Sequence, residues 1–177
     1  MTIPTLNAVG FCAHYSEQGD WAFEYALRLA RLYDVQLNVF HFLADPYDPD
    51  AEPPDHLSRS ERADLIIRKE RELRLYYDQL AGDYLDVGFR LCEDNEWSEL
   101  HRCLLIREFQ ILVLAYPEWN ASFAGRSLED FADAFVCPVV LVGPVRRGQY
   151  HLNRPAALLA GQLDLEGSWT ELELVKG

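Results

Sequence analysis

Short apolar runs alternate along this chain with stretches in which apolar residues recur every three or four positions. The runs at residues 8–12, 35–43 and 110–115 are too short for ordinary helices and rich in strand-forming residues, so they predict buried strands. Between the first two runs, the apolar positions follow the spacing of one helix face: Ala22, Tyr25, Ala26, Leu29, Ala30 and Tyr33. The chain is therefore predicted to begin as strand, helix, strand.

The same alternation continues to about residue 145. After a loop at residues 44–55 with four prolines and five acidic residues, the pattern predicts a long helix over 57–79 and a strand over 84–91. A helix then precedes the strand at 110–115, and a short helix precedes a last strand at 137–144. This order predicts an α/β fold, a doubly wound parallel sheet of five strands with helices on both faces.

In such sheets, ligands bind beyond the carboxyl ends of the strands, where the strand order changes direction. The loops that follow the first, second and fourth predicted strands meet at this place. The candidate site is therefore built from residues 13–16, 42–45 and 115–127.

Two residues of this candidate site, His14 and Ser16, have the side chains of a general base and a nucleophile. Only Glu17 or Asp45 is placed to orient the histidine, and no further catalytic pattern converges on it. A hydrogen-bonded loop histidine is therefore the favoured interpretation, and no catalytic residue is predicted. A small hydrolase or transferase on this fold is the least favoured of three functional hypotheses.

The net charge of the chain disfavours some classes of binding partner. With 16 basic and 29 acidic residues, the chain carries a formal net charge of −13, which disfavours nucleic acid and anionic membranes. Positive charge gathers only at residues 59–74, where acidic residues interleave with it, so this segment is interpreted as a solvated helix face with ion pairs.

The sequence offers neither a membrane span nor an export signal, so a cytoplasmic protein is expected. Four cysteines stand far apart without a CxxC pair, and the five histidines show no ligand-like spacing. Reduced thiols and no metal site are therefore predicted.

The chain resembles the universal stress protein family over about residues 5–145. Three stretches carry the resemblance: the loop and helix start at 16–27, the second strand at 39–42, and Gly125 followed by the strand at 137–142. The resemblance implies a sheet like that of the adenine-nucleotide alpha hydrolases, with strand order 3-2-1-4-5. It also implies a role in a stress response, which no residue pattern here shows directly.

One subgroup of that family binds ATP through a glycine-rich loop after the fourth strand, where backbone N–H groups approach the phosphates. This chain departs from the family motif at most of its positions. Ala115 and Glu118 replace the first two glycines, Gly125 is retained, and Arg126 takes the position of the following hydroxyl residue. The resemblance therefore predicts a degenerate nucleotide site.

Two hypotheses for this crevice follow from the resemblance. In the first, Phe42, Trp119 and Phe123 fill it, and the protein needs no cofactor. In the second, a remodelled site still binds ATP, ADP or AMP, with the arginine at a helix N-terminus replacing the glycine loop. The second hypothesis assigns the nucleotide to seven residues: His14, Ser16, Phe42, Ala115, Gly125, Arg126 and Ser127.

Residues 146–177 extend beyond the family-like domain of residues 1–145. Apolar and acidic residues alternate at 163–168 and 171–175, which predicts a short β-hairpin. We expect this extension to cover the last sheet edge or to pack on a partner subunit, since relatives dimerise through that strand; a partly ordered extension is the alternative. The leading hypothesis is a non-enzymatic, cytoplasmic homodimer that acts through protein contacts.

Overall fold

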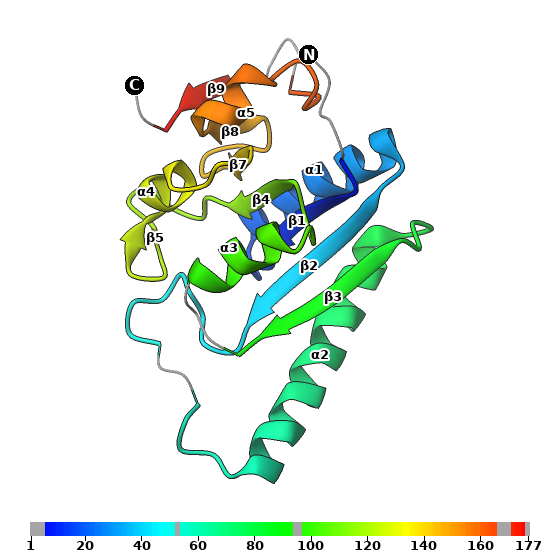
Figure 1. Cartoon of the computed structure of the whole chain (residues 1–177), viewed down its shortest axis with the longest axis vertical. Helices are drawn as coiled ribbons and strands as arrows, with labels where there is room; N and C mark the ends of the chain where they lie inside the picture. Colours follow the sequence, from blue (N-terminus) through cyan, green and yellow to red (C-terminus); the bar gives the residue numbers. More distant parts are fainter. Residues whose placement is uncertain (1–5, 52–53, 94–96, 166–170, 176–177) are drawn as a thin grey trace.

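The computed structural model describes residues 6–51, 54–93, 97–165 and 171–175. A sheet of seven strands forms its centre, in the order β3-β2-β1-β4-β7-β8-β9 (Figure 1). The strands of this sheet are β1 (Ala8–Cys12), β2 (Gln36–Phe42), β3 (Val87–Cys92), β4 (Ile111–Ala115), β7 (Val139–Val142), β8 (Gln149–Leu152) and β9 (Glu171–Leu174). The helices are α1 (Glu17–Tyr33), α2 (Arg59–Ala81), α3 (Trp97–Leu105), α4 (Leu128–Asp133) and α5 (Arg154–Leu158).

The five predicted strands are all present, and they pair in parallel with one another. Their order is β3-β2-β1-β4-β7, which confirms the predicted order 3-2-1-4-5. Val9 of β1 lies between Leu37 of β2 and Ile111 of β4, so β1 is the strand at which the order changes direction. The sheet has seven strands rather than five because the C-terminal extension contributes two more.

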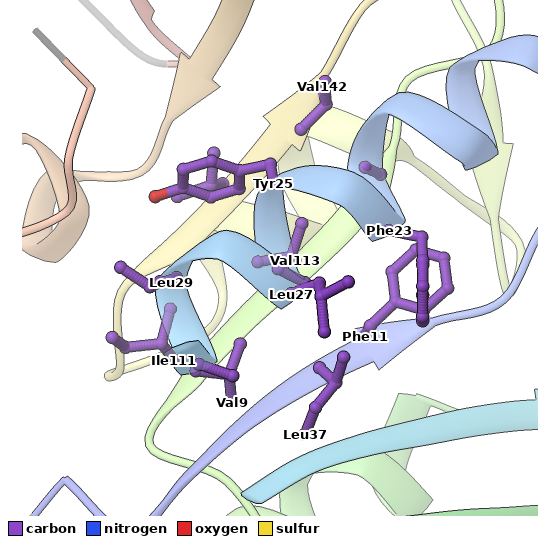
Figure 2. Close-up of a cluster of buried hydrophobic side chains, with 14 of the residues drawn as sticks. Val9, Phe11, Phe23, Tyr25, Leu27, Leu29, Leu37, Ile111, Val113 and Val142 are labelled. Carbon is purple, nitrogen blue, oxygen red and sulfur yellow. The ribbon is translucent and has the colours of Figure 1, made fainter. Parts of the chain in front are cut away.

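Helices cover both faces of the sheet, as predicted. On one face, α1, the C-terminal part of α2, and α5 enclose a cluster of buried apolar side chains with β1, β4 and β7. Figure 2 shows this cluster, in which Phe23 of α1 lies against Phe11 of β1 with ring centroids 5.4 Å apart. On the other face, α3 and α4 enclose a second cluster around Phe40 and Leu114.

Helix α1 contains the whole predicted apolar face, and polar side chains mark both of its ends. The side chain of Ser16 accepts a hydrogen bond from the backbone N–H of Gly19, and Asp34 ends the helix in the left-handed conformation with a φ of 52°. A side chain at Gly19 would meet the carbonyl oxygen of His14 at 1.8 Å. Glycine here lets the first turn of α1 lie directly against the loop that follows β1.

The C-terminal extension continues the main sheet. Strand β8 pairs antiparallel with β7, and β9 pairs parallel with β8, so the predicted hairpin is wrong. Leu163 and Leu165 belong to the apolar core and lie outside any strand, while residues 166–168 of the predicted hairpin lie outside the described residues. The coverage of the β7 edge by the extension is confirmed.

This topology changes the expectation about dimers. Strand β7 has β4 on one side and β8 on the other, so it is an interior strand and not the edge that a partner subunit was expected to use. A homodimer remains a prediction, and its interface must lie elsewhere. None of the helices in the described part of the chain is long and apolar enough to cross a membrane.

Candidate functional site

A cleft of about 240 Å³ opens at the carboxyl ends of β1 and β2, on the side covered by α2. The position agrees with the sequence-based expectation that loops after the first two strands form the site. Of the seven residues assigned to a nucleotide, His14 and Phe42 line this cleft. The full lining is Ala13, His14, Tyr15, His41, Phe42, Leu43, Asp45, Pro46 and Lys69.

His14 and Ser16 contact each other directly at the mouth of α1. The Nδ1 atom of His14 lies 2.7 Å from the Oγ atom of Ser16, and that oxygen also accepts the Gly19 N–H at 2.9 Å. Burial lowers the pKa of His14, while Asp45 acts in the opposite direction. With His14 neutral, its Nδ1 atom accepts a hydrogen bond from the Ser16 hydroxyl, so a structural role at the cap of α1 accounts for this pair.

The second histidine of the cleft, His41, lies near charges of both signs. Its pKa is lowered to about 4, chiefly by burial and also by the nearby Lys69, while Asp45 and Glu72 act in the opposite direction. The ring also lies 5.7 Å from that of Tyr15. At neutral pH the cleft therefore presents two uncharged imidazoles, one ammonium group and one carboxylate.

His41 is expected to make the protein less stable in mild acid. Its pKa is 6.5 for the free side chain and about 4 in the folded chain, so the unfolded state binds more protons between these values. The free energy of unfolding therefore falls as the pH drops from about 6.5 to about 4, by up to about 3 kcal/mol for this group. Urea unfolding over this pH range measures the effect.

The matched pair of variants for this experiment is His41→Asn and His56→Asn, because His56 is exposed. Removing His41 is expected to flatten the pH dependence, and removing His56 is expected to leave it unchanged. Equal slopes in the wild type and in His41→Asn would show that His41 does not titrate between these limits.

Three aromatic side chains close the crevice between the loops after β2 and β4. This aromatic cluster consists of Phe42, Tyr47 and Phe123, with Phe123 fully buried and the Tyr47 and Phe123 ring centroids 5.0 Å apart. The Tyr47 hydroxyl donates to the carbonyl oxygen of Ala115 at 2.8 Å, and its ring lies 4.4 Å from that of His14. The space directly after β4 is therefore occupied by protein side chains.

Sequence analysis identified Phe42 and Phe123 but not Tyr47. Tyr47 belongs to the proline-rich acidic loop, where nothing in the local pattern distinguishes a packed tyrosine from a solvated one. The backbone N–H of Ala124 donates to the carbonyl oxygen of Pro46 at 2.8 Å, which ties this loop to the loop after β4. This long-range contact helps to hold Tyr47 in the crevice.

Trp119 does not fill the crevice, so this part of the first hypothesis is wrong. Its side chain is 51% exposed and lies on the side of the C-terminal extension. The nearest rings are those of Tyr116 and His151, each with a centroid 5.5 Å away. Glu118, the neighbouring residue, is also exposed.

The last three residues of the proposed nucleotide set lie around a two-stranded turn formed by β5 (Ser122–Phe123) and β6 (Arg126–Ser127). Gly125 has a φ of +81° in this turn, and the Ser127 side chain caps α4 by accepting the Asp130 N–H at 3.1 Å. Arg126 is exposed, and its charge adds to burial, the main cause, in lowering the pKa of His101 of α3. None of the three residues lines the described cleft.

The four cysteines are buried and free. Burial raises the pKa of Cys92, Cys103 and Cys137 to about 12 and that of Cys12 well above its ordinary value. Thiolates are therefore rare at neutral pH, which makes these groups poor nucleophiles. Within residues 6–51, 54–93, 97–165 and 171–175, no group of three His, Cys, Asp or Glu side chains is arranged to hold a metal ion.

Comparison with known proteins identifies the fold. No family profile and no curated protein sequence matches this chain. Among solved structures, a universal stress protein from Archaeoglobus fulgidus matches with a TM-score of 0.53 and 13% identity, over 77% of this chain and 97% of its own. The universal stress protein UspA from Lactobacillus plantarum matches with a TM-score of 0.51 and 14% identity, over 78% and 98%.

A third structure, a universal stress protein in complex with cAMP, matches with a TM-score of 0.52 and 16% identity, over 78% of this chain and 97% of its own. At identities this low, the structural match establishes the fold and does not establish the activity. The structure thus confirms, at the level of the fold, the resemblance seen in the sequence: this chain has the fold of the universal stress proteins.

Proposed function

We propose that this chain is a non-enzymatic stress-response protein of the universal stress protein type, cytoplasmic and acting through contacts with protein chains. In this proposal the crevice after β4 no longer accepts the triphosphate of ATP. The fold supports the general assignment, and the −13 charge of the chain argues against nucleic acid as the partner.

The aromatic cluster is the observation that carries this proposal. A triphosphate needs backbone N–H groups that approach it closely, which glycines permit and bulky side chains prevent. Here Tyr47 and Phe123 lie beside the end of β4, and the Ala115 carbonyl oxygen accepts the Tyr47 hydroxyl. A carbonyl oxygen and two rings offer no cradle for negative charge.

Thermal unfolding with ATP, ADP, AMP and cAMP tests this proposal. At about 5 mM nucleotide, we expect the melting temperature to change by less than about 1 °C, whereas a ligand at a hundredfold excess over its Kd would add about 2.7 kcal/mol. The same melts are recorded for Arg126→Ala and for its control Arg59→Ala, which changes an exposed arginine on α2. A rise of several degrees that Arg126→Ala abolishes and Arg59→Ala retains would overturn the closed crevice.

The second candidate is a nucleotide-binding stress regulator, and the open cleft beside His14 and Phe42 is the observation that favours it. One protein of the same fold was solved with cAMP. In this case the base and ribose would occupy the cleft next to Lys69 while the phosphates stay outside the aromatic cluster. A rise in melting temperature with AMP or cAMP that Lys69→Ala abolishes and Arg126→Ala retains would establish this candidate instead.

A further inference from the structure

Strand β9 leaves one edge of the main sheet open. It pairs with β8 and with no other strand in the part of the chain that the structure describes, and Figure 1 shows it at the margin of the sheet. The Val175 N–H donates to the carbonyl oxygen of Leu152 at 2.9 Å. Because backbone groups of successive strand residues point to opposite sides, those of Leu172 and Leu174 point away from β8. Their N–H and C=O groups are placed to pair with a further strand.

The two faces of β9 differ in chemistry. Leu172 is 43% exposed and Leu174 is 42% exposed. The strand register sets these two leucines beside Tyr150 and Leu152 of β8, on the face that carries α1 and α5. Glu173 lies on the opposite face, and its side chain is 46% exposed. The open edge therefore has apolar side chains on one face and a carboxylate on the other.

A half-exposed indole lies next to that carboxylate. The buried ring of His151 contacts both, with its Nδ1 atom 3.3 Å from a Glu173 oxygen and its centroid 5.5 Å from that of the Trp119 ring. Tyr116 lies against the same two rings, and its hydroxyl donates to a Glu129 carboxylate oxygen at 2.9 Å. An exposed indole beside carboxylates is suited to an ammonium or guanidinium group.

The charge of the protein favours a basic partner at this edge. The chain has a net charge of −13, and β9 has the sequence ELEL, with two acidic residues and no basic one. A second copy that added its own β9 would bring these acidic residues together, and like charges on paired strands are unfavourable. A basic segment would instead be attracted to the edge.

The alternation along β9 specifies the pattern of such a segment. In an added strand, successive side chains would point to opposite faces of the sheet. If basic and apolar residues alternate, the apolar ones lie beside Leu172 and Leu174, while a basic one lies beside Glu173 and Trp119. Addition of a strand to an open sheet edge is a common mode of peptide recognition.

We propose that the open edge of β9 binds an extended segment of a protein partner in which basic and apolar residues alternate. The backbone of Leu172 and Leu174 provides the hydrogen bonds, and Glu173 with Trp119 recognises a lysine or arginine side chain. The strand has four residues, so the contact is small, and binding is weak and sensitive to salt. The inference rests on the proposed function only for the idea that the protein acts through contacts with protein chains.

Fluorescence anisotropy of a labelled peptide with the full chain tests this edge. The probe is a capped peptide of alternating lysine and valine, about eight residues long, for which we expect a Kd of about 10–100 µM at low salt. A peptide of the same composition, with its lysines and valines in two separate blocks, is expected to bind at least about tenfold more weakly. So is a peptide of alternating glutamate and valine.

Three variants examine the backbone, the indole and the carboxylate. Leu172→Pro removes an N–H that points away from β8, so β9 keeps its pairing while the Kd rises at least about tenfold. Trp119→Ala and Glu173→Gln are each expected to raise the Kd about threefold to tenfold. Glu72→Gln, at an exposed position on α2, is the control for the charge and is expected to leave the Kd unchanged.

Circular dichroism melts of each variant separate a lost edge from a lost fold. If Leu172→Pro lowers the melting temperature, Trp119→Ala and Glu173→Gln carry the test, because both side chains are partly exposed.

The proposal is overturned if the alternating lysine–valine peptide does not bind, or if the block peptide binds as tightly. Variants that keep both the fold and the wild-type Kd also contradict it. A self-association in sedimentation velocity that Leu172→Pro abolishes would assign the edge to a second copy instead. The nucleotide experiment is independent of these outcomes, so failure of one proposal is distinguishable from failure of the other.

Discussion

A chain ending at residue 145 is expected to lose its native fold, although the family-like part of the sequence remains intact. The missing extension supplies four large buried side chains to the core: Tyr150, Leu152, Leu163 and Leu165. Burying side chains of this size contributes on the order of 6–12 kcal/mol in total, which equals most of the 5–15 kcal/mol that stabilises an ordinary domain. The deletion also exposes the backbone groups of β7 that pair with β8.

Circular dichroism and hydrogen exchange of the 1–145 chain beside the full chain measure this loss. Two point variants separate core packing from chain length: Leu163→Ala removes a fully buried side chain, and Leu158→Ala removes one that is 71% exposed. The first is expected to lower the free energy of unfolding by about 2–5 kcal/mol and the second by less than about 0.5 kcal/mol. A 1–145 chain that melts at the temperature of the full chain would show that the extension is an appendage.

Substitution of Asn153 is expected to give the largest effect of any single polar residue. Asn153 is fully buried between β8 and α5. Its side-chain oxygen accepts from the N–H groups of Val139 at 2.9 Å and Ala156 at 3.1 Å. Its amide nitrogen donates to the carbonyl oxygens of Ala132 at 3.1 Å and Cys137 at 2.9 Å. One side chain thus satisfies four backbone groups in a region without bulk water.

In Asn153→Ala, four hydrogen bonds are lost at once, and among the described residues only the Ala132 carbonyl oxygen keeps another donor, the Phe135 N–H at 3.3 Å. We therefore expect a loss of about 3–5 kcal/mol in the free energy of unfolding. Urea unfolding measures this loss, and Asn7→Ala, at an exposed position, serves as the control, with an expected change below about 0.5 kcal/mol. A loss below about 1 kcal/mol in Asn153→Ala would show that water or a shifted backbone replaces the asparagine.

The five principal strands and the helices between them are predictable because each has a clear local sequence pattern. The apolar spacing from Ala22 to Tyr33 has the helical period, and the run at 110–115 is continuously apolar, as a strand buried on both faces requires. The right-handed crossover then leaves few arrangements for such alternation. The resemblance to the universal stress proteins supplied the strand order itself.

The C-terminal extension shows where local patterns fail. Leu163 and Leu165 alternate with acidic residues as strand residues do, but their side chains are fixed by packing near α1. The Tyr25 hydroxyl donates to the Leu163 carbonyl oxygen at 2.6 Å, and Arg28 pairs with Asp164 at 2.9 Å. These partners lie more than 130 residues earlier in the chain, so the pattern at 163–165 carries no trace of them.

In the candidate site, too, the sequence placed some residues and could not place others. Sequence placed His14 and Phe42 at the carboxyl ends of β1 and β2 because parallel strands end at one edge of the sheet. It could not place Tyr47 or Trp119, whose positions depend on how two loops pack. The position of a residue at the end of a strand is fixed by strand pairing in the sheet. The position of a loop residue depends on how the loops pack against each other.

By itself, the sequence determined the class of the fold, the five principal strands of its first 145 residues with the helices between them, and the net charge that disfavours nucleic acid. Only the tertiary structure decided that the extension adds β8 and β9 to the sheet, that β7 is an interior strand, and that Tyr47 occupies the crevice after β4. The physical reason is the distance along the chain over which each kind of interaction acts. Periodicity and capping act within a few residues, whereas strand pairing, loop packing and buried hydrogen bonds join residues far apart in the chain.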